Sequence, residues 1–184
     1  MKGLFGKYAV IGVVVLLIGL AVLARLLPHP ANFAPVAAVA IFGGAVLPRR
    51  LAVITPLLAM VVSDVIIGVY DWRIMCTVWA CYAVTAYVSN CVLKKPTVVR
   101  GMALTLVVST FFFVVTNLAV WAASGMYAHT WQGLGDCYYM ALPFFRNTVF
   151  SDVLYTVLLF AAWRLALLAA TRTWVRFGGM VHRV

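Results

Sequence analysis

Six apolar segments, separated by short polar breaks, dominate this sequence. We predict helices over residues 7–27, 35–47, 51–69, 74–93, 102–124 and 148–170. The hydrocarbon core of a bilayer is about 30 Å thick, and an apolar helix of about 20 residues crosses it. Only 10% of the residues are charged, against about 25% in a soluble domain. The sequence therefore predicts an all-α integral membrane protein, with residues 1–184 forming a single six-helix transmembrane domain.

The second segment, residues 35–47, is too short to cross a bilayer upright at about 1.5 Å per residue, unless its neighbours bury it or thin the membrane. It carries pairs of small residues four positions apart, which are Ala34 with Ala38 and Ala40 with Gly44. Such pairs let helix backbones approach closely. We expect this face to pack inside the bundle, and the alternative is that it docks a partner protein.

The charged residues predict how the bundle is oriented. The net charge is +10, but the basic residues lie in short clusters between apolar segments, which is typical of membrane topology and not of a nucleic-acid-binding patch. With the N-terminus inside, ten of them face the cytoplasm: Lys2, Lys7, Arg49, Arg50, Lys94, Lys95, Arg100, Arg172, Arg176 and Arg183. Three fall outside, namely Arg25, Arg73 and Arg146. We predict cytoplasmic termini and a multi-pass protein of the bacterial cytoplasmic membrane, with the lipid bilayer around it and no nucleic-acid partner.

The four acidic residues are expected at the opposite, outer end: Asp64, Asp71, Asp136 and Asp152. Two of them lie in the stretch from Ser63 to Tyr82, which also holds two cysteines and two tryptophans. Ionisable groups in such apolar surroundings are costly, and they mark functional sites by default. The stretch therefore predicts a ligand site on the outer side. The alternative is an ion pair of Asp64 or Asp71 with Arg73 that fixes the loop.

The last outer connection, residues 125–147, is long and rich in aromatic residues. Loops of this length in a compact bundle are usually functional. We expect it to lie on the bundle as a lid or an interfacial half-helix, and the alternative is an aromatic belt at headgroup level. Asp152 would then lie near the start of the last helix, where the helix dipole favours an anion.

Cys76 lies in the first turn of the fourth predicted helix, close to Arg73 in sequence, and this position favours a thiolate. A thiolate at the mouth of a pocket is a suitable ligand for a soft or borderline transition metal. Cys81 and Cys91 are expected to be apolar core residues. His29, held between two prolines, is a further candidate ligand. A thiol redox enzyme that uses Cys76 with Cys137 is a separate alternative.

Several catalytic and energy-coupling motifs are absent from the sequence. It contains no phosphate-binding glycine loop, no HExxH and no GxSxG. The inner half of the predicted bundle holds no carboxylate, whereas an ion-coupled pump normally needs one near mid-membrane. We therefore predict a substrate-capturing transporter, and neither an enzyme nor a self-contained coupled pump.

Four motifs carry a family resemblance: PHPANFAPVAAVAIFGGA, SDVIIGVYDWRIM, TNLAVWAASGMY and ALPFFRNT. Between Pro28 and Asp152 the chain resembles the six-helix substrate-binding S-components of energy-coupling-factor vitamin transporters. Within that group it is most similar to the solitary cobalamin transporters of the BtuM type. The resemblance implies capture of cobalamin (vitamin B12) at the outer face and its movement inward. It also implies ligation of the corrin cobalt by Cys76, with Cys81 as the second candidate, and no other cofactor.

The resemblance implies pocket roles for His29, Asp64 and Tyr82. Loops at residues 28–34, 70–76 and 125–147 would enclose the corrin, which makes further residues candidates for substrate binding: Asn32, Phe33, Tyr70, Asp71, Trp72, Arg73, Phe145, Arg146 and Asn147. The first helix lacks the Ala-xxx-Ala face of subunits that share an ATPase module, as expected of a solitary member without one. The alternatives are another vitamin, a metal ion such as cobalt, or a membrane scaffold subunit.

Overall fold

The structure, a computed structural model, describes residues 6–181, and these residues form six α-helices and no strand. The helices are α1 (Lys7–Leu26), α2 (Val36–Val46), α3 (Arg49–Ile67), α4 (Trp72–Val92), α5 (Val98–Ala123) and α6 (Trp131–Val181). All except α2 are long and apolar enough to cross a membrane. The prediction of an all-α bundle with six helices is confirmed. The length and apolar character of these helices indicate a multi-pass membrane protein. Of the ten basic residues assigned to the cytoplasm, Lys2 and Arg183 lie outside the described residues.

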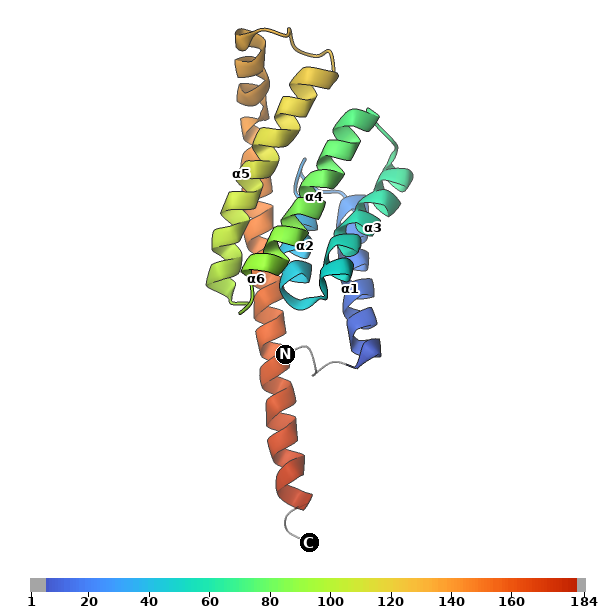
Figure 1. The fold of residues 1–184 in the computed structure, drawn as a ribbon, viewed down its shortest axis with the longest axis vertical. Helices are drawn as coiled ribbons and strands as arrows, with labels where there is room; N and C mark the ends of the chain where they lie inside the picture. The colour runs from blue at the N-terminus through green and yellow to red at the C-terminus, as the bar shows by residue number, and fades with distance from the viewer. Residues whose placement is uncertain (1–5, 182–184) are drawn as a thin grey trace.

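Successive helices run in opposite directions, so the bundle has two distinct ends (Figure 1). We call one the basic end, because Arg49 and Arg50 begin α3 there and Lys94 and Lys95 follow α4. We call the other the cavity end, where α1 gives way to α2 and α3 to α4. Both ends of each helix from α1 to α5 lie within four residues of the predicted positions.

The short helix α2 lies at the centre and contacts each of the five other helices. Nine of its 11 residues are buried, from Val36 to Gly44. Gly44 permits this arrangement, because a Cβ there would lie 2.5 Å from the Ser89 Cβ and 2.7 Å from the Ala86 carbonyl oxygen. Neighbouring helices therefore compensate for the short length of α2, and its small residues pack within the chain as expected.

Large apolar side chains cover the outer surface of the surrounding helices. Val65 is 71% exposed and Val107 is 64% exposed, and both lie on long helices that are suited to cross a membrane. A surface of this kind is typical of contact with lipid. Among the buried polar residues, Thr105, Ser109, Asp152 and Thr156 lie between α5 and α6, and Asp64 lies between α1 and α3.

The last helix differs most from the prediction. α6 begins at Trp131, and only residues 124–130 separate it from α5, so residues 125–147 are not a long loop. The loop that remains packs closely against the start of α6, since a Cβ at Gly133 would lie 2.1 Å from the Ala128 carbonyl oxygen. α6 runs alongside α5 through the aromatic segment (Figure 1), where Tyr138 and Phe145 pack against Phe113 of α5. The predicted half-helix is thus the first part of one continuous helix.

Candidate functional site

A cavity of about 340 Å³ opens at the cavity end and reaches into the middle of the bundle. Seven separate parts of the chain line it: α1, the α1–α2 connection, α3, the α3–α4 connection, α4, α5 and α6. The polar members of its wall are Arg25, His29, Asn32, Tyr70, Tyr82, Thr148 and Asp152. Pockets of roughly 300–1,000 Å³ that combine an apolar lining with a few polar groups are typical of small-molecule sites.

One side of the cavity is built on an ion pair between Arg25 and Asp64. The Asp64 side chain is 2% exposed, and it accepts a second hydrogen bond from Trp79 Nε1 at 2.8 Å. A second nitrogen of Arg25 donates to the Met60 sulfur at 2.9 Å. Asp64 therefore pairs with Arg25 of α1 and not with Arg73, and the charge of each group is balanced inside the bundle.

The floor of the cavity holds a second carboxyl group, Asp152, which is 3% exposed. The Ser109 hydroxyl of α5 donates to Asp152 Oδ2 at 2.7 Å. Tyr82 and Phe112 line the same floor, with ring centroids 5.1 Å apart. Asp152 does not cap α6, because the helix begins about six turns earlier at Trp131. The expectation that it lies at the outer end with the other carboxylates is wrong, since its partner Ser109 lies near the middle of α5 (Val98–Ala123).

The connection between α1 and α2 brings two predicted residues to the cavity. Asn32 has a positive φ of 59°, which is uncommon for a residue with a side chain and is often found at functional sites. The ring nitrogens of His29 lie 2.8 Å from the Pro30 carbonyl oxygen and 3.3 Å from that of Arg25. Asn147 supports this connection from α6, because its amide donates to the Ala31 carbonyl oxygen at 3.1 Å.

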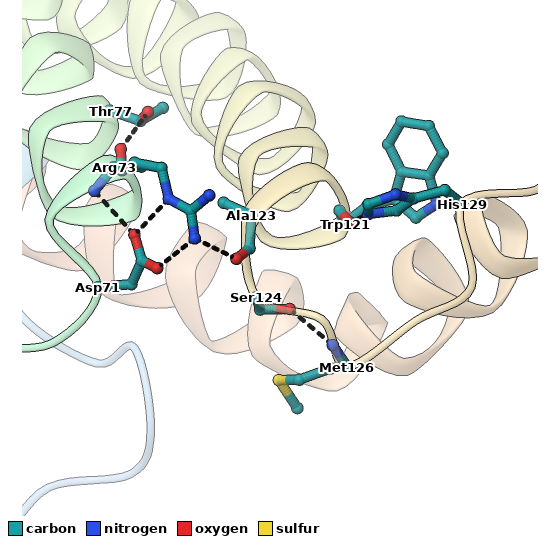
Figure 2. A network of polar contacts seen from close by, with 8 residues as sticks. All are labelled: Asp71, Arg73, Thr77, Trp121, Ala123, Ser124, Met126 and His129. Atoms are coloured by element: carbon teal, nitrogen blue, oxygen red, sulfur yellow. Dashed lines mark hydrogen bonds and ion pairs between the residues drawn. The ribbon is translucent and has the colours of Figure 1, made fainter.

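Asp71 and Arg73 form an exposed network next to the cavity (Figure 2). Arg73 Nη2 donates to Asp71 Oδ2 and to the Ala123 carbonyl oxygen, both at 2.7 Å, so it ties the start of α4 to the end of α5. The hydrogen bonds from Arg73 lower the pKa of Asp71 to about 2. The prediction of a loop-fixing ion pair is confirmed for Asp71. Neither residue lines the cavity, and Trp72 between them is 68% exposed.

A second cavity of about 190 Å³ lies beside the first and shares part of its wall. Asn32, Val78, Phe112 and Thr148 line both cavities. Of the residues predicted in the aromatic segment, Phe145 lines this second cavity, whereas Arg146 lies in an apolar surface groove with Leu142, Val149, Phe150 and Val153. Phe33 packs against Phe150 and Tyr155.

The four cysteines are free thiols in this structure. Cys76 is exposed and lines neither cavity; it lies two residues before Val78 on α4, and positions two apart do not share a helix face. Burial, and then the charge of Asp64, raise the pKa of Tyr70 to about 12, with Cys76 adding to the rise and Arg25 opposing it. Cys81 is buried, and the Cys137 thiol donates to the Asn117 carbonyl oxygen at 3.4 Å.

The structure thus gathers His29, Asn32, Tyr70 and Tyr82 in one cavity, with Asp64 behind its wall. Sequence reasoning did not nominate Arg25, Ser109, Thr148 or Asp152 for the site. The sequence could have indicated two of them, because Arg25 and Asp152 are isolated charged residues in long apolar segments. Among the residues that the structure describes, no group of three His, Cys, Asp or Glu side chains could hold a metal ion.

The chain matches a protein-family model over most of its length. The model of a family of unknown function, DUF6580, matches residues 7–174. No curated protein and no solved structure matches the chain.

Proposed function

Because the chain belongs to the DUF6580 family, whose function is unknown, we propose a function from the site itself: a membrane transporter that captures a solute in the cavity and carries it across the bilayer. The observation that carries this proposal is the set of polar groups around the cavity. Arg25, Asp64 and Asp152 are ionisable groups inside a bundle of membrane-spanning helices, where such groups are rare and usually mark substrate pathways.

The orientation that we infer places the basic end in the cytoplasm and the cavity outside. The clustered arginines and lysines at the basic end support it, because cytoplasmic connections are enriched in these residues. The setting would be the cytoplasmic membrane of a bacterium. Reporter fusions at the two ends test this: alkaline phosphatase should be active when inserted after Ser124 and inactive when fused after α6. The reverse result would contradict the orientation.

Cobalamin is the substrate that the family resemblance suggests, with the cobalt on the Cys76 thiolate. Two observations bear on it. Cys76 is exposed and lines neither cavity, and its charge adds to the rise in the pKa of Tyr70, which lines the first cavity. A corrin with its side chains is larger than either cavity, so the wall that they share, which includes Val78 and Phe112, would have to move for cobalamin to enter. A solitary transporter of this kind would work without a dedicated ATPase module.

The test is the visible spectrum of the protein purified in detergent from cells grown with cobalamin. We expect about one corrin per chain and a spectrum altered by the thiolate in wild type. Cys76→Ser should lose the alteration, while Cys91→Ser, at the basic end, is the matched control and should keep it. If Cys81→Ser alone loses the spectral alteration, then Cys81 is the cobalt ligand.

A colourless preparation that also fails to bind added cobalamin would contradict cobalamin as substrate. The capture of another vitamin or of a metal ion would then be the form of the proposal to test. The scaffold alternative requires the small residues of α2 to meet a partner, but Ala38 and Gly44 are buried against the chain's own helices. The redox alternative requires Cys76 and Cys137 to act together, and activity that survives Cys137→Ser would count against it.

A further inference from the structure

Asp152 is a buried carboxyl group that lines the cavity and has no cationic partner among the described residues. Arg25 pairs with Asp64, and Trp79 satisfies the second oxygen of that carboxylate. Asp152, in contrast, has the Ser109 hydroxyl as its hydrogen-bond partner and no ion pair among the described residues. A carboxylate buried without a cation is strongly disfavoured, and such groups usually become neutral by binding a proton.

Among the described residues no cationic side chain forms an ion pair with Asp152, and of the titratable groups that line the same cavity His29 and Tyr70 belong to its connections. From α5 the neighbour is Ser109, and the nearest basic residue in that helix, Arg100, is in its first turn. α2, which also packs against α6, has no titratable residue. Across the cavity, α4 presents the phenol of Tyr82, and α1 presents Arg25, whose charge is balanced by Asp64. The buried thiol of Cys81 lies near Tyr82 and carries no positive charge.

Two further hydroxyls continue from Asp152 towards the basic end. One helical turn along α6 lies Thr156, whose hydroxyl oxygen is 3.0 Å from that of Thr105 on α5, and both residues are fully buried. Thr105 in turn donates to the Gly101 carbonyl oxygen at 2.9 Å. Buried hydroxyls are therefore aligned along the α5–α6 interface, beginning at the floor of the cavity.

From this arrangement we propose that Asp152 is a proton-binding site at the middle of the bundle, reached from the cavity and held by the Ser109 hydroxyl. A sodium ion would need several oxygen ligands, whereas a proton binds to one carboxyl oxygen of Asp152 itself, and the Ser109 hydroxyl is the single hydrogen-bond donor to this carboxyl group. If the chain transports its solute as proposed above, on which this consequence rests, the bound proton is the coupling ion. A mid-membrane carboxyl group is what ion-coupled transporters require. The sequence-based expectation that the chain is not a self-contained coupled pump rested on the absence of such a group, and the position of Asp152 beside Ser109 removes that ground.

Infrared spectroscopy of the full chain in lipid nanodiscs tests the site without any solute. The sequence favours this method, because it has four aspartates and no glutamate. At neutral pH we expect the C=O stretch of a protonated carboxylic acid in wild type and its loss in Asp152→Asn. The band should remain in Asp71→Asn and Asp136→Asn, whose side chains lie at the surface, and it should disappear in wild type at alkaline pH.

Three results would overturn the proposal. They are the absence of the band from wild type at neutral pH, its persistence in Asp152→Asn, and its removal by sodium at constant pH, which would make the site a sodium site. If Asp152→Asn does not fold, Ser109→Ala replaces it: loss of the hydroxyl donor should shift the frequency of the band, and an unshifted band contradicts the proposal. None of these results depends on cobalamin, so a failure of the proposed substrate remains distinguishable.

Discussion

At the basic end, α2 and α4 meet through backbone atoms and small side chains, whereas at the cavity end the helices meet through charged ones. Gly44 lies directly against Ala86 and Ser89, and the Asn90 amide donates to the Gly44 and Leu47 carbonyl oxygens at 2.9 and 3.1 Å. At the other end, Arg25 and Asp64 join α1 to α3 beside an open cavity. Close packing brings the backbones of α2 and α4 into contact beside a further cavity of about 350 Å³ at the basic end, while charge pairing can hold helices together around a space.

The largest effect is expected from breaking the charge pair. Asp64→Asn leaves the Arg25 guanidinium without a counterion in an apolar bundle, and loss of one partner of a buried pair costs about 3–5 kcal/mol. We expect the free energy of unfolding in detergent to fall by about that amount. Replacing both partners, as in Arg25→Met with Asp64→Leu, should recover most of the loss.

Asp71→Asn is the matched control for that experiment, because its ion pair with Arg73 is exposed and such pairs contribute little. Equal losses in Asp64→Asn and Asp71→Asn would show that burial does not distinguish the two pairs. The proposed difference between interior and surface charges at the cavity end would then be wrong.

The next largest effect on stability is expected at the basic end, where α2 and α4 pack closely. Gly44→Ala puts a Cβ against Ser89 and the Ala86 carbonyl oxygen, and overpacking of this kind costs about 1–3 kcal/mol. Gly43→Ala is the control, since the nearest atom to its added Cβ is a side-chain carbon of Leu47 at 3.6 Å, which is ordinary contact. Thermal unfolding should separate the two variants. A Gly44→Ala protein as stable as Gly43→Ala would mean that α2 and α4 can move apart.

Filling the cavity should affect binding more than stability. Val78 lines both cavities, so Val78→Trp would occupy the wall that they share. We expect at least a tenfold loss of corrin retained on purification, with a smaller change in thermal stability than in Gly44→Ala. Val107→Trp, on the exposed surface of α5, is the control and should retain the corrin. Retention in Val78→Trp would place the binding site elsewhere.

The smallest effect is a pH dependence of the Asp71 network. Contact with Arg73 lowers the pKa of Asp71 from 3.8 to about 2 in the folded protein. Because the folded pKa is the lower one, the stabilisation is present above about pH 4 and is lost as the pH falls through about 2. The difference in melting temperature between wild type and Asp71→Asn should therefore shrink to zero over this range. A difference that persists at the acid limit would contradict the assignment.

The sequence was sufficient for those features that depend on local pattern. Apolar segment lengths predict six helices, and the Asp71–Arg73 pair could be foreseen because the partners are two residues apart. The pairing of Asp64 with Arg25, 39 residues away, depends on which helices become neighbours, and hydropathy does not specify that. The start of α6 was missed because Pro143 and the polar residues near it resemble a loop. That error also misplaced Asp152.

The burial of α2 has a consequence for how the chain enters the membrane. At about 1.5 Å per residue its 11 residues extend about 16 Å, roughly half of the hydrocarbon core, so lipid alone would not retain this helix. Its contacts with all five other helices arise only when the bundle assembles. We therefore expect α2 and α3 to be inserted together as a hairpin, with Arg49 and Arg50 anchoring the turn, and α2 to be secured only when α4, α5 and α6 close around it.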